Sequence, residues 1–228
     1  DGSSTVGWTD TDNGQGLQFG QEYTYRIVAV YPNGTESKPS NEITSGLVSG
    51  VPVITNVSVT NTSSSDGSIY VAWKKPDRLD TIPAYGPYEY LIYRAEGVSG
   101  TDYIQVHSIQ TADLNDTVFI DSQINTLSTG YIYRIELYNN APGNRFLVGE
   151  PGYASSLFIT VTPGDEKARF TISRNVPWIN TSYVFYRLNG STMSYDSVGV
   201  TNLLHYADTG LVNGEEYCYY VRSTGAYQ

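Results

Sequence analysis

The sequence has almost none of the residues from which metal centres and nucleophilic sites are usually built. Its 228 residues include one cysteine, Cys218, and two histidines, His107 and His205. Neither histidine has a cysteine or a second histidine at ligand spacing, so zinc binding is not expected. No run of roughly 18 apolar residues occurs, so no helix spanning a bilayer is expected either. We therefore expect no metal, no cofactor and no direct membrane insertion in this segment.

Enzyme motifs are also missing. There is no glycine-rich phosphate loop, no Ser–His–Asp set and no HExxH sequence, so we assign no catalytic residue and expect no enzyme activity. The formal net charge of −10, without a basic stripe, argues against nucleic acid as a partner. Asp10–Gly14 superficially resembles a calcium loop, but Gly14 and Gln15 stand where a ligand and a glycine are needed. A solvated turn is the preferred interpretation.

The sequence is rich in tyrosine, and its apolar and polar residues alternate. Tyrosine accounts for 21 residues, which suits sheet positions that are apolar at the ring and wet at the hydroxyl. Apolar and polar residues alternate, and Gly, Pro, Asn or Asp interrupts them about every 8 to 12 residues, as in β-sandwiches and barrels. Helical periodicity is absent. The sequence therefore predicts an all-β fold.

One strand motif occurs three times: Leu17–Ala29 returns as Tyr131–Ile135 and again as Leu211–Val221. The first and third copies share a leucine, a glycine and two tyrosines at the same spacing: Leu17, Gly20, Tyr23 and Tyr25 match Leu211, Gly214, Tyr217 and Tyr219. A second repeat matches Tyr90–Arg94 with Tyr183–Arg187, each upstream of an aspartate, Asp121 or Asp208. Repetition over roughly 100 residues predicts an array of similar domains.

The expected strands divide the chain into three units. Residues 1–48 hold what look like the last three strands of one domain, residues 49–156 a full set of seven, and residues 157–228 a domain that stops after its sixth strand. Because a half-sandwich should not persist alone in water, we expect the chain to be part of a larger protein. The linkers are Ser45–Pro52 and Ser155–Leu157, and the second is so short that its joint should be stiff.

These residues resemble tandem fibronectin type III domains, which are immunoglobulin-like β-sandwiches. The resemblance is carried by a tryptophan on the second strand, by a tyrosine-rich third strand ending in arginine, and by the tyrosine that opens the sixth strand: Trp73, Tyr90, Tyr93, Arg94, Tyr131 and Tyr133. It implies tyrosine corners at Tyr23, Tyr131 and Tyr217. Two departures are that Phe170–Ser173 has no tryptophan and that the leucine expected before Tyr131 is missing.

The sequence also resembles repeats of large Bacteroidetes surface proteins exported by the type IX system, including gliding-associated ones. The segment most similar to those repeats is Asp208–Tyr219, and Pro52–Val59 is also similar to them. This resemblance implies an extracytoplasmic place: at the cell surface, associated with the outer membrane, or secreted. Those bacteria attach glycans to Ser or Thr in Asp-Ser/Thr-apolar triplets, so Thr81, Thr117 and Ser197 are candidate O-glycosylation sites, with ordinary turn residues as the alternative.

Cys218 lies between Tyr217 and Tyr219, so its side chain should point to the opposite face of the strand from theirs. In an exported protein, a lone cysteine in this place is expected to pair with a cysteine beyond Gln228, on a seventh strand. The alternative is a buried free thiol that packs as a small hydrophobe.

The function that these features favour is a non-catalytic spacer, scaffold or protein-binding surface. Its partners would be other protein domains or outer-membrane proteins. The long loop Asp77–Pro87 is the candidate binding loop, because long loops in compact domains are usually functional. Its candidate residues are Asp77, Arg78, Leu79, Asp80, Tyr85 and Tyr88; alternatively, the loop is a rim that packs on a neighbouring domain. Two other functions stay open: an accessory arm of a secreted glycoside hydrolase or protease, and a fixed subunit of an outer-membrane assembly.

Overall fold

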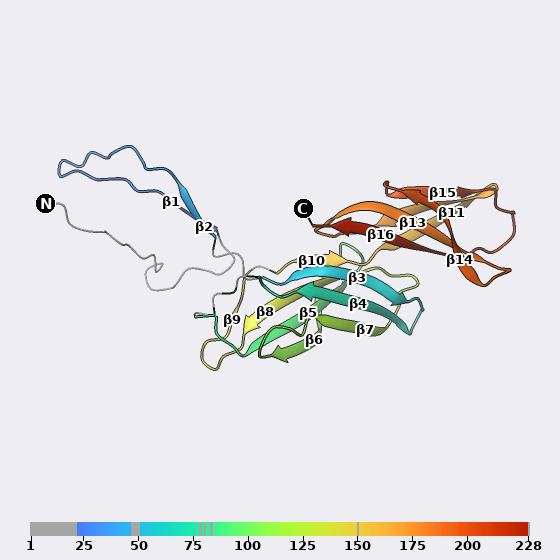
Figure 1. Ribbon diagram of the computed structural model, residues 1–228, viewed down its shortest axis with the longest axis horizontal. Coiled ribbons are helices and arrows are strands. Elements are labelled where there is room, and N and C mark those ends of the chain that lie inside the picture. Colours follow the sequence, from blue (N-terminus) through green and yellow to red (C-terminus); the bar gives the residue numbers. More distant parts are fainter. Residues whose placement is uncertain are drawn as a thin grey trace.

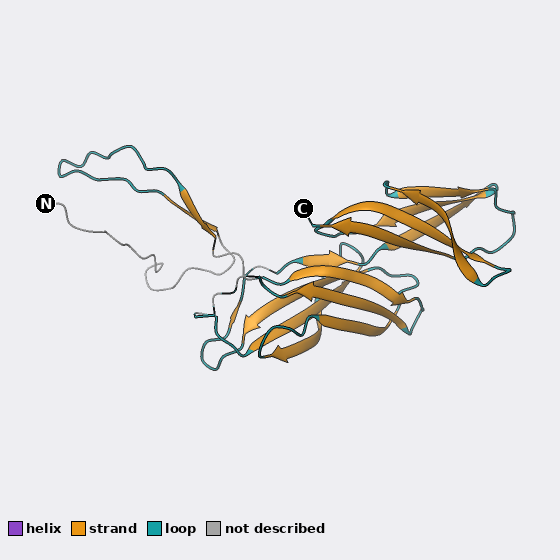
Figure 2. Ribbon diagram, in the orientation of Figure 1, coloured by secondary structure: helices purple, strands orange, loops and turns teal. Residues whose placement is uncertain are grey.

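The fold is described from a computed structural model of the chain. The structure describes residues 22–46, 51–77, 79, 81–82, 84–149 and 151–227. Throughout these residues the regular elements are β-strands, gathered into antiparallel sheets, as Figures 1 and 2 show. The all-β prediction is therefore confirmed. No helix in this part of the chain is long and apolar enough to cross a membrane.

The middle of the chain forms a complete two-sheet sandwich. One sheet has the order β3–β4–β7, made of Val53–Asn61, Gly67–Lys74 and Val118–Ile124. The other has the order β10–β8–β5–β6, made of Tyr153–Ser155, Tyr131–Asn139, Tyr88–Glu96 and Ile104–Thr111, and the short β9 (Phe146–Leu147) also pairs with β8. This order is that of an immunoglobulin-like sandwich of the fibronectin type III kind.

The core of this sandwich lies between the two sheets. In β4 every second side chain is buried, so Ile69, Val71 and Trp73 point to the opposite sheet. Trp73 meets the ring of Tyr90 edge-on, with ring centroids 5.2 Å apart. The central strand β8 is buried along nearly its whole length. The chain that returns after β8 is divided into β9 and β10, with Pro151 between them.

The C-terminal part forms a second sandwich. One sheet is β11–β12–β15 and the other is β14–β13–β16. Their bounds are Phe158–Gly164, Lys167–Ser173 and His205–Thr209, and then Ser194–Thr201, Ile179–Asn189 and Tyr219–Ala226. Phe170, Tyr183 and Phe185 form the centre of its core. β15 is short, and only Tyr206 and Asp208 on one of its faces turn inward.

The N-terminal described segment is a hairpin. β1 (Glu22–Tyr25) pairs with β2 (Ile43–Gly46), and the chain reverses at Gly34, whose φ of 81° suits glycine. The Gly34 N–H donates to the Tyr31 carbonyl at 2.8 Å, which closes the turn. The Asp10–Gly14 stretch lies outside the described residues.

Candidate functional site

Hydrogen bonds join the linker between the two sandwiches to each of them. Within the linker, the Ser155 N–H donates to the Asn175 carbonyl at 2.8 Å, and the Asn175 N–H donates to Ser155 Oγ at 2.7 Å. One residue on, the Ser156 N–H donates to the Tyr131 carbonyl at 2.8 Å, and the Tyr131 N–H donates to Ser156 Oγ at 3.2 Å. Both serines are buried. The linker thus belongs to the packed structure on each side of it.

Apolar contacts close the same joint. Val176 and Trp178, which belong to the C-terminal sandwich, pack against the core of the middle one. Trp178 also meets the ring of Tyr227 edge-on at 5.8 Å, and the Tyr227 hydroxyl donates to the Ile54 carbonyl. At Gly130 the approach is so close that an added Cβ would lie 3.0 Å from that of Phe158. The two sandwiches therefore share an apolar interface.

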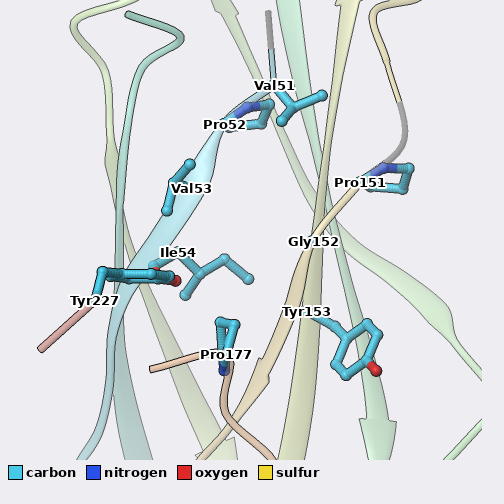
Figure 3. A pocket seen from close by; sticks show the side chains of 9 residues that line it. All are labelled: Val51, Pro52, Val53, Ile54, Pro151, Gly152, Tyr153, Pro177 and Tyr227. Carbon is cyan, nitrogen blue, oxygen red and sulfur yellow. The ribbon is translucent and has the colours of Figure 1, made fainter. Parts of the chain in front are cut away.

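A hollow opens beside this joint, with a volume of about 320 Å³ (Figure 3). Its wall combines strand β3, the approach to β10 and the C-terminal sandwich: Val51, Pro52, Val53, Ile54, Pro151, Gly152, Tyr153, Pro177 and Tyr227. The lining is almost wholly apolar, and burial raises the pKa of the Tyr227 hydroxyl. Such a hollow can accept an apolar side chain, and none of the described residues that line it is charged.

A second feature is an ion-paired tyrosine network, which each sandwich builds in the same way. In the middle sandwich Arg94 Nη1 lies 2.7 Å from Asp121 Oδ2, and the Tyr133 hydroxyl donates to the same oxygen at 2.8 Å. The C-terminal sandwich repeats both distances with another three residues, Arg187, Asp208 and Tyr219. Both trios join the two sheets of their sandwich. The sequence repeats contained these residues, but their pairing was not inferred from them.

The surroundings of the networks shift the tyrosines away from ionisation. Burial raises the pKa of Tyr133, and the neighbouring Asp121 carboxylate raises it further. Burial also raises the pKa of Tyr219, to about 12, with the hydrogen bond to Asp208 acting in the same direction. These hydroxyls are therefore neutral donors at physiological pH. No group of three or more metal-ligating side chains occurs among the described residues.

The candidate binding loop divides into surface and core. Asp77 and Tyr85 are exposed, whereas Leu79 packs against the middle core. Tyr88 is buried, and its hydroxyl donates to the Ala84 carbonyl at 2.9 Å, so it takes no part in the loop surface. The other two candidates, Arg78 and Asp80, lie outside the described residues. A binding role for the loop stays a prediction.

The tyrosines expected at corners lie where their strands begin. The Tyr217 hydroxyl accepts a hydrogen bond from the Val212 N–H at 2.9 Å, which is the bond that a tyrosine corner makes. For Tyr131 burial raises the pKa, and a backbone hydrogen bond with Asn125 is among the effects that oppose it. Tyr23 lies in β1 and stacks on Tyr25, with ring centroids 6.5 Å apart.

The remaining candidates lie on the surface. Cys218 is an exposed free thiol, which does not fit the buried alternative, and its disulfide to a later residue stays a prediction. Among the candidate glycosylation sites Thr81 and Ser197 are exposed and Thr117 is half-buried. Nothing in the structure gives these three side chains a common surface or a shared partner.

No protein-family model matches the sequence, and no curated protein matches it. Solved structures that are similar to the chain include the FN1–FN3 domains of chicken CNTN1, at 12% identity over 91% of this chain and 72% of that one, with a TM-score of 0.28. Domains d3–d4 of the rat CD45 extracellular region are 17% identical over 68% and 71%, with a TM-score of 0.31. The central fibronectin-III array of RIM-binding protein is 14% identical over 78% and 67%, with a TM-score of 0.29.

Proposed function

We propose that this chain is a non-catalytic spacer and scaffold segment of a large exported bacterial protein, at the cell surface or the outer membrane. The observation that carries the proposal is the joint, where Trp178 and Val176 of the C-terminal sandwich pack against the core of the middle one. A spacer needs a fixed angle between its domains, and a packed apolar interface provides one. Domains joined only by a flexible linker would move independently.

The joint resists bending in two ways. Bending away from Trp178 would expose apolar surface, which costs roughly 25 cal/mol for each Å² returned to water. Bending at the linker would break the reciprocal bonds of Ser155 and Asn175, which are buried on the serine side. Each lost buried hydrogen bond costs on the order of 1 kcal/mol or more. The pair of sandwiches should therefore behave as one rod.

Small-angle scattering of the purified chain tests this rigidity. We expect Trp178→Ala to broaden the distribution of distances between the sandwiches and to leave the fold of each intact, because the residue packs at the boundary. Tyr85→Ala is the matched control, since this aromatic is exposed and takes part in none of the joint contacts described above. If the wild-type chain already scatters as two independent bodies, or if both variants scatter alike, the spacer proposal fails.

The cellular place is a separate part of the proposal, and it rests on the resemblance to type IX-exported repeats. Fractionation of the source organism, with limited proteolysis of intact cells, measures it directly. A surface spacer would be cut by added protease in intact cells. Protection of the chain until the cells are lysed would contradict an exported location, and recovery with a hydrolase domain in the same polypeptide would favour the accessory-arm alternative.

A further inference from the structure

Strand β6 is an edge strand of the middle sandwich. It pairs with β5 on one side, and among the described residues no other strand lies along its outer side (Figure 1). This sandwich is complete, with β3, β4 and β7 facing β10, β8, β5 and β6, so no strand of its own is needed at this edge. The sequence of β6 is IQVHSIQT, without a charged residue, a proline or a glycine.

Other edge strands of the described sheets have the features that keep an edge from pairing. β7 contains Asp121, β14 contains Asp196, β11 contains Pro163, and β10 is three residues long. The pairing of β3 shifts its register at two places. Charge, proline, short length and bulges are the means by which natural proteins protect edge strands. β6 has one such shift near its start and is regular from His107 to Thr111, so this stretch is open to a further strand.

The bonds of β5 determine which backbone groups of β6 face outward. At one end of β5 the Asn140 N–H donates to the Pro87 carbonyl, and at the other end the Gly97 N–H donates to the Gly130 carbonyl. Backbone groups alternate in direction along a strand. The odd-numbered residues of β5 therefore direct their backbone groups to β8, and the even-numbered residues direct theirs to β6.

Two residues of β6 offer open backbone groups. Ile109 pairs with Tyr90, an even-numbered residue of β5, so its backbone groups point to β5. Ser108 and Gln110, on either side of it, therefore direct their N–H and C=O groups to the outer edge. The side chains of both residues are exposed. The edge thus presents two donors and two acceptors, which a strand lying alongside could satisfy.

Carboxylates lie at both ends of this uncharged edge. Asp102 precedes β6, Asp113 and Asp116 follow it, and all three are exposed. The hydrogen bond from the Asn115 N–H lowers the pKa of the Asp113 carboxyl, which is therefore ionised at neutral pH. Lys75, which donates to Asn115 Oδ1 at 2.7 Å, is a cation at the same end, opposite two carboxylates.

These charges select the strand that can add. If two copies of β6 paired antiparallel, the start of one strand would lie beside the end of the other, and Asp102 would approach Asp113 and Asp116. Like charges opposite each other disfavour such a pairing. The same carboxylates favour a strand with basic ends, and the net charge of −10 acts in the same direction.

From these observations we infer that the outer edge of β6 binds an extended segment of another protein, with uncharged β-forming residues at its centre and Lys or Arg at both ends. The segment adds as a further strand: main-chain bonds to Ser108 and Gln110 supply the affinity, and the charges at the two ends select the partner. This binding activity is separate from the rigidity of the joint, because β6 takes part in none of the joint contacts described above.

A fluorescent synthetic peptide tests the inference on the full chain. The peptide alternates valine and threonine between a pair of lysines at each end. We expect fluorescence anisotropy to show saturable binding, and the same peptide with glutamates in place of the lysines to bind at least about tenfold more weakly. Equal binding of the two peptides, or no binding of the lysine peptide, would overturn the inference.

Backbone N-methylation of the peptide separates strand addition from simple attraction of charges. Methyl groups on alternate valine and threonine residues block one edge of the peptide and leave its other edge able to pair, so binding should persist. Methyl groups on all of these residues block both edges, and binding should be lost although side chains and charges are unchanged. Binding that survives full methylation would contradict strand addition.

A variant of the edge itself tests where the peptide binds. Gln110→Pro removes one outward N–H and keeps the bonds to β5, because proline is tolerated on an edge strand where the N–H faces outward. We expect it to weaken binding of the lysine peptide about tenfold. Gln110→Ala, the matched control, keeps the N–H and should bind as the wild type does. Equal binding by the two variants would contradict pairing at this edge.

Hydrogen exchange of the wild-type chain locates the peptide without any variant. On addition of the lysine peptide, exchange of the Ser108 and Gln110 amides should slow, because these N–H groups become bonded. Exchange of the Ile109 amide, which already points to β5, should change less. Slowing that is confined to other strands would place the peptide elsewhere and would overturn the inference.

Discussion

The two sandwiches have the same internal network and differ in how well it is covered. In the middle sandwich the side chain of Arg94 is 17% exposed beside Asp121, and in the C-terminal sandwich that of Arg187 is 31% exposed beside Asp208. The distances within the two ion pairs are equal. What differs is the pairing of the strand that carries the tyrosine. In the middle sandwich β8 is paired with β10, whereas β16 is the outermost described strand of its sheet.

This difference separates two properties of an ion pair that usually vary together, its geometry and its burial. Geometry is set locally, because an arginine at the end of the third strand and an aspartate before the sixth reach each other in both sandwiches. Burial is set by the neighbouring strand. An ion pair costs more to break where it is drier, because the remaining charge cannot recover its hydration. The middle network should therefore be worth more to stability than its C-terminal copy.

The largest expected effect comes from removing the aspartates. Asp121→Ala should lower the free energy of unfolding of the middle sandwich by about 3 to 5 kcal/mol, because it leaves the largely buried Arg94 without its carboxylate partner. Asp208→Ala should cost roughly half as much, since Arg187 retains contact with water. Hydrogen exchange measured peptide by peptide reports each sandwich separately.

Asp66→Ala is the control for this pair of variants, because Asp66 is exposed and its side chain lies outside both networks. It should change neither sandwich by more than about 0.5 kcal/mol. Equal losses from Asp121→Ala and Asp208→Ala would contradict the argument from burial.

Much of this comparison could be predicted from the sequence, because it depends on local patterns. The strand motif around Tyr131 and its copy around Tyr217 identified equivalent strands, and the paired segments ending in Arg94 and Arg187 identified another. The ion pairs themselves also left a signal, since an aspartate stands at a similar place in both units. The ion pairs could be inferred from these aspartates only with the topology known, because the third strand lies beside the sixth and faces the fifth.

The joint left no comparable signal. Trp178 follows Pro177 outside any alternating run, and its sequence context is the same whether it faces solvent or a neighbouring domain. Its contact with the middle core depends on how two sandwiches meet, which a strand pattern does not encode. The strand β15 has a weak sequence pattern for a related reason: His205–Thr209 is short and is defined by its pairing with β12. The stiffness expected from a short linker remains for the scattering experiment to measure.

A smaller effect is expected at the tyrosine of each network. Tyr219→Phe removes one hydrogen bond to Asp208 and should lower stability at pH 7 by about 1 to 2 kcal/mol. The penalty should depend on pH. The pKa of Tyr219 in the folded state is raised to about 12, from 10 for a free tyrosine, so its stabilising contribution is complete below pH 10.

As the pH rises from 10 to about 12, the unfolded chain releases this proton and the folded chain retains it, so the contribution is lost. Denaturation of wild type and Tyr219→Phe at several pH values should show their stabilities converging over this interval. A difference that stays constant to pH 12 would contradict the assigned role. Tyr133→Phe should give the larger loss at pH 7, because Tyr133 is fully buried.

The smallest effect should come from the corner at the open end of the C-terminal sandwich. Tyr217→Phe removes only the bond from the Val212 N–H, and because this donor is exposed, water can replace the lost partner. We expect a loss of about 0.5 kcal/mol in unfolding free energy, at the low end for a hydrogen bond. The matched change Tyr131→Phe acts where the ring is 3% exposed, so water has less access and the cost should be greater. Chemical denaturation of the two variants measures both losses, and a loss for Tyr217→Phe equal to that for Tyr131→Phe would contradict the argument from burial.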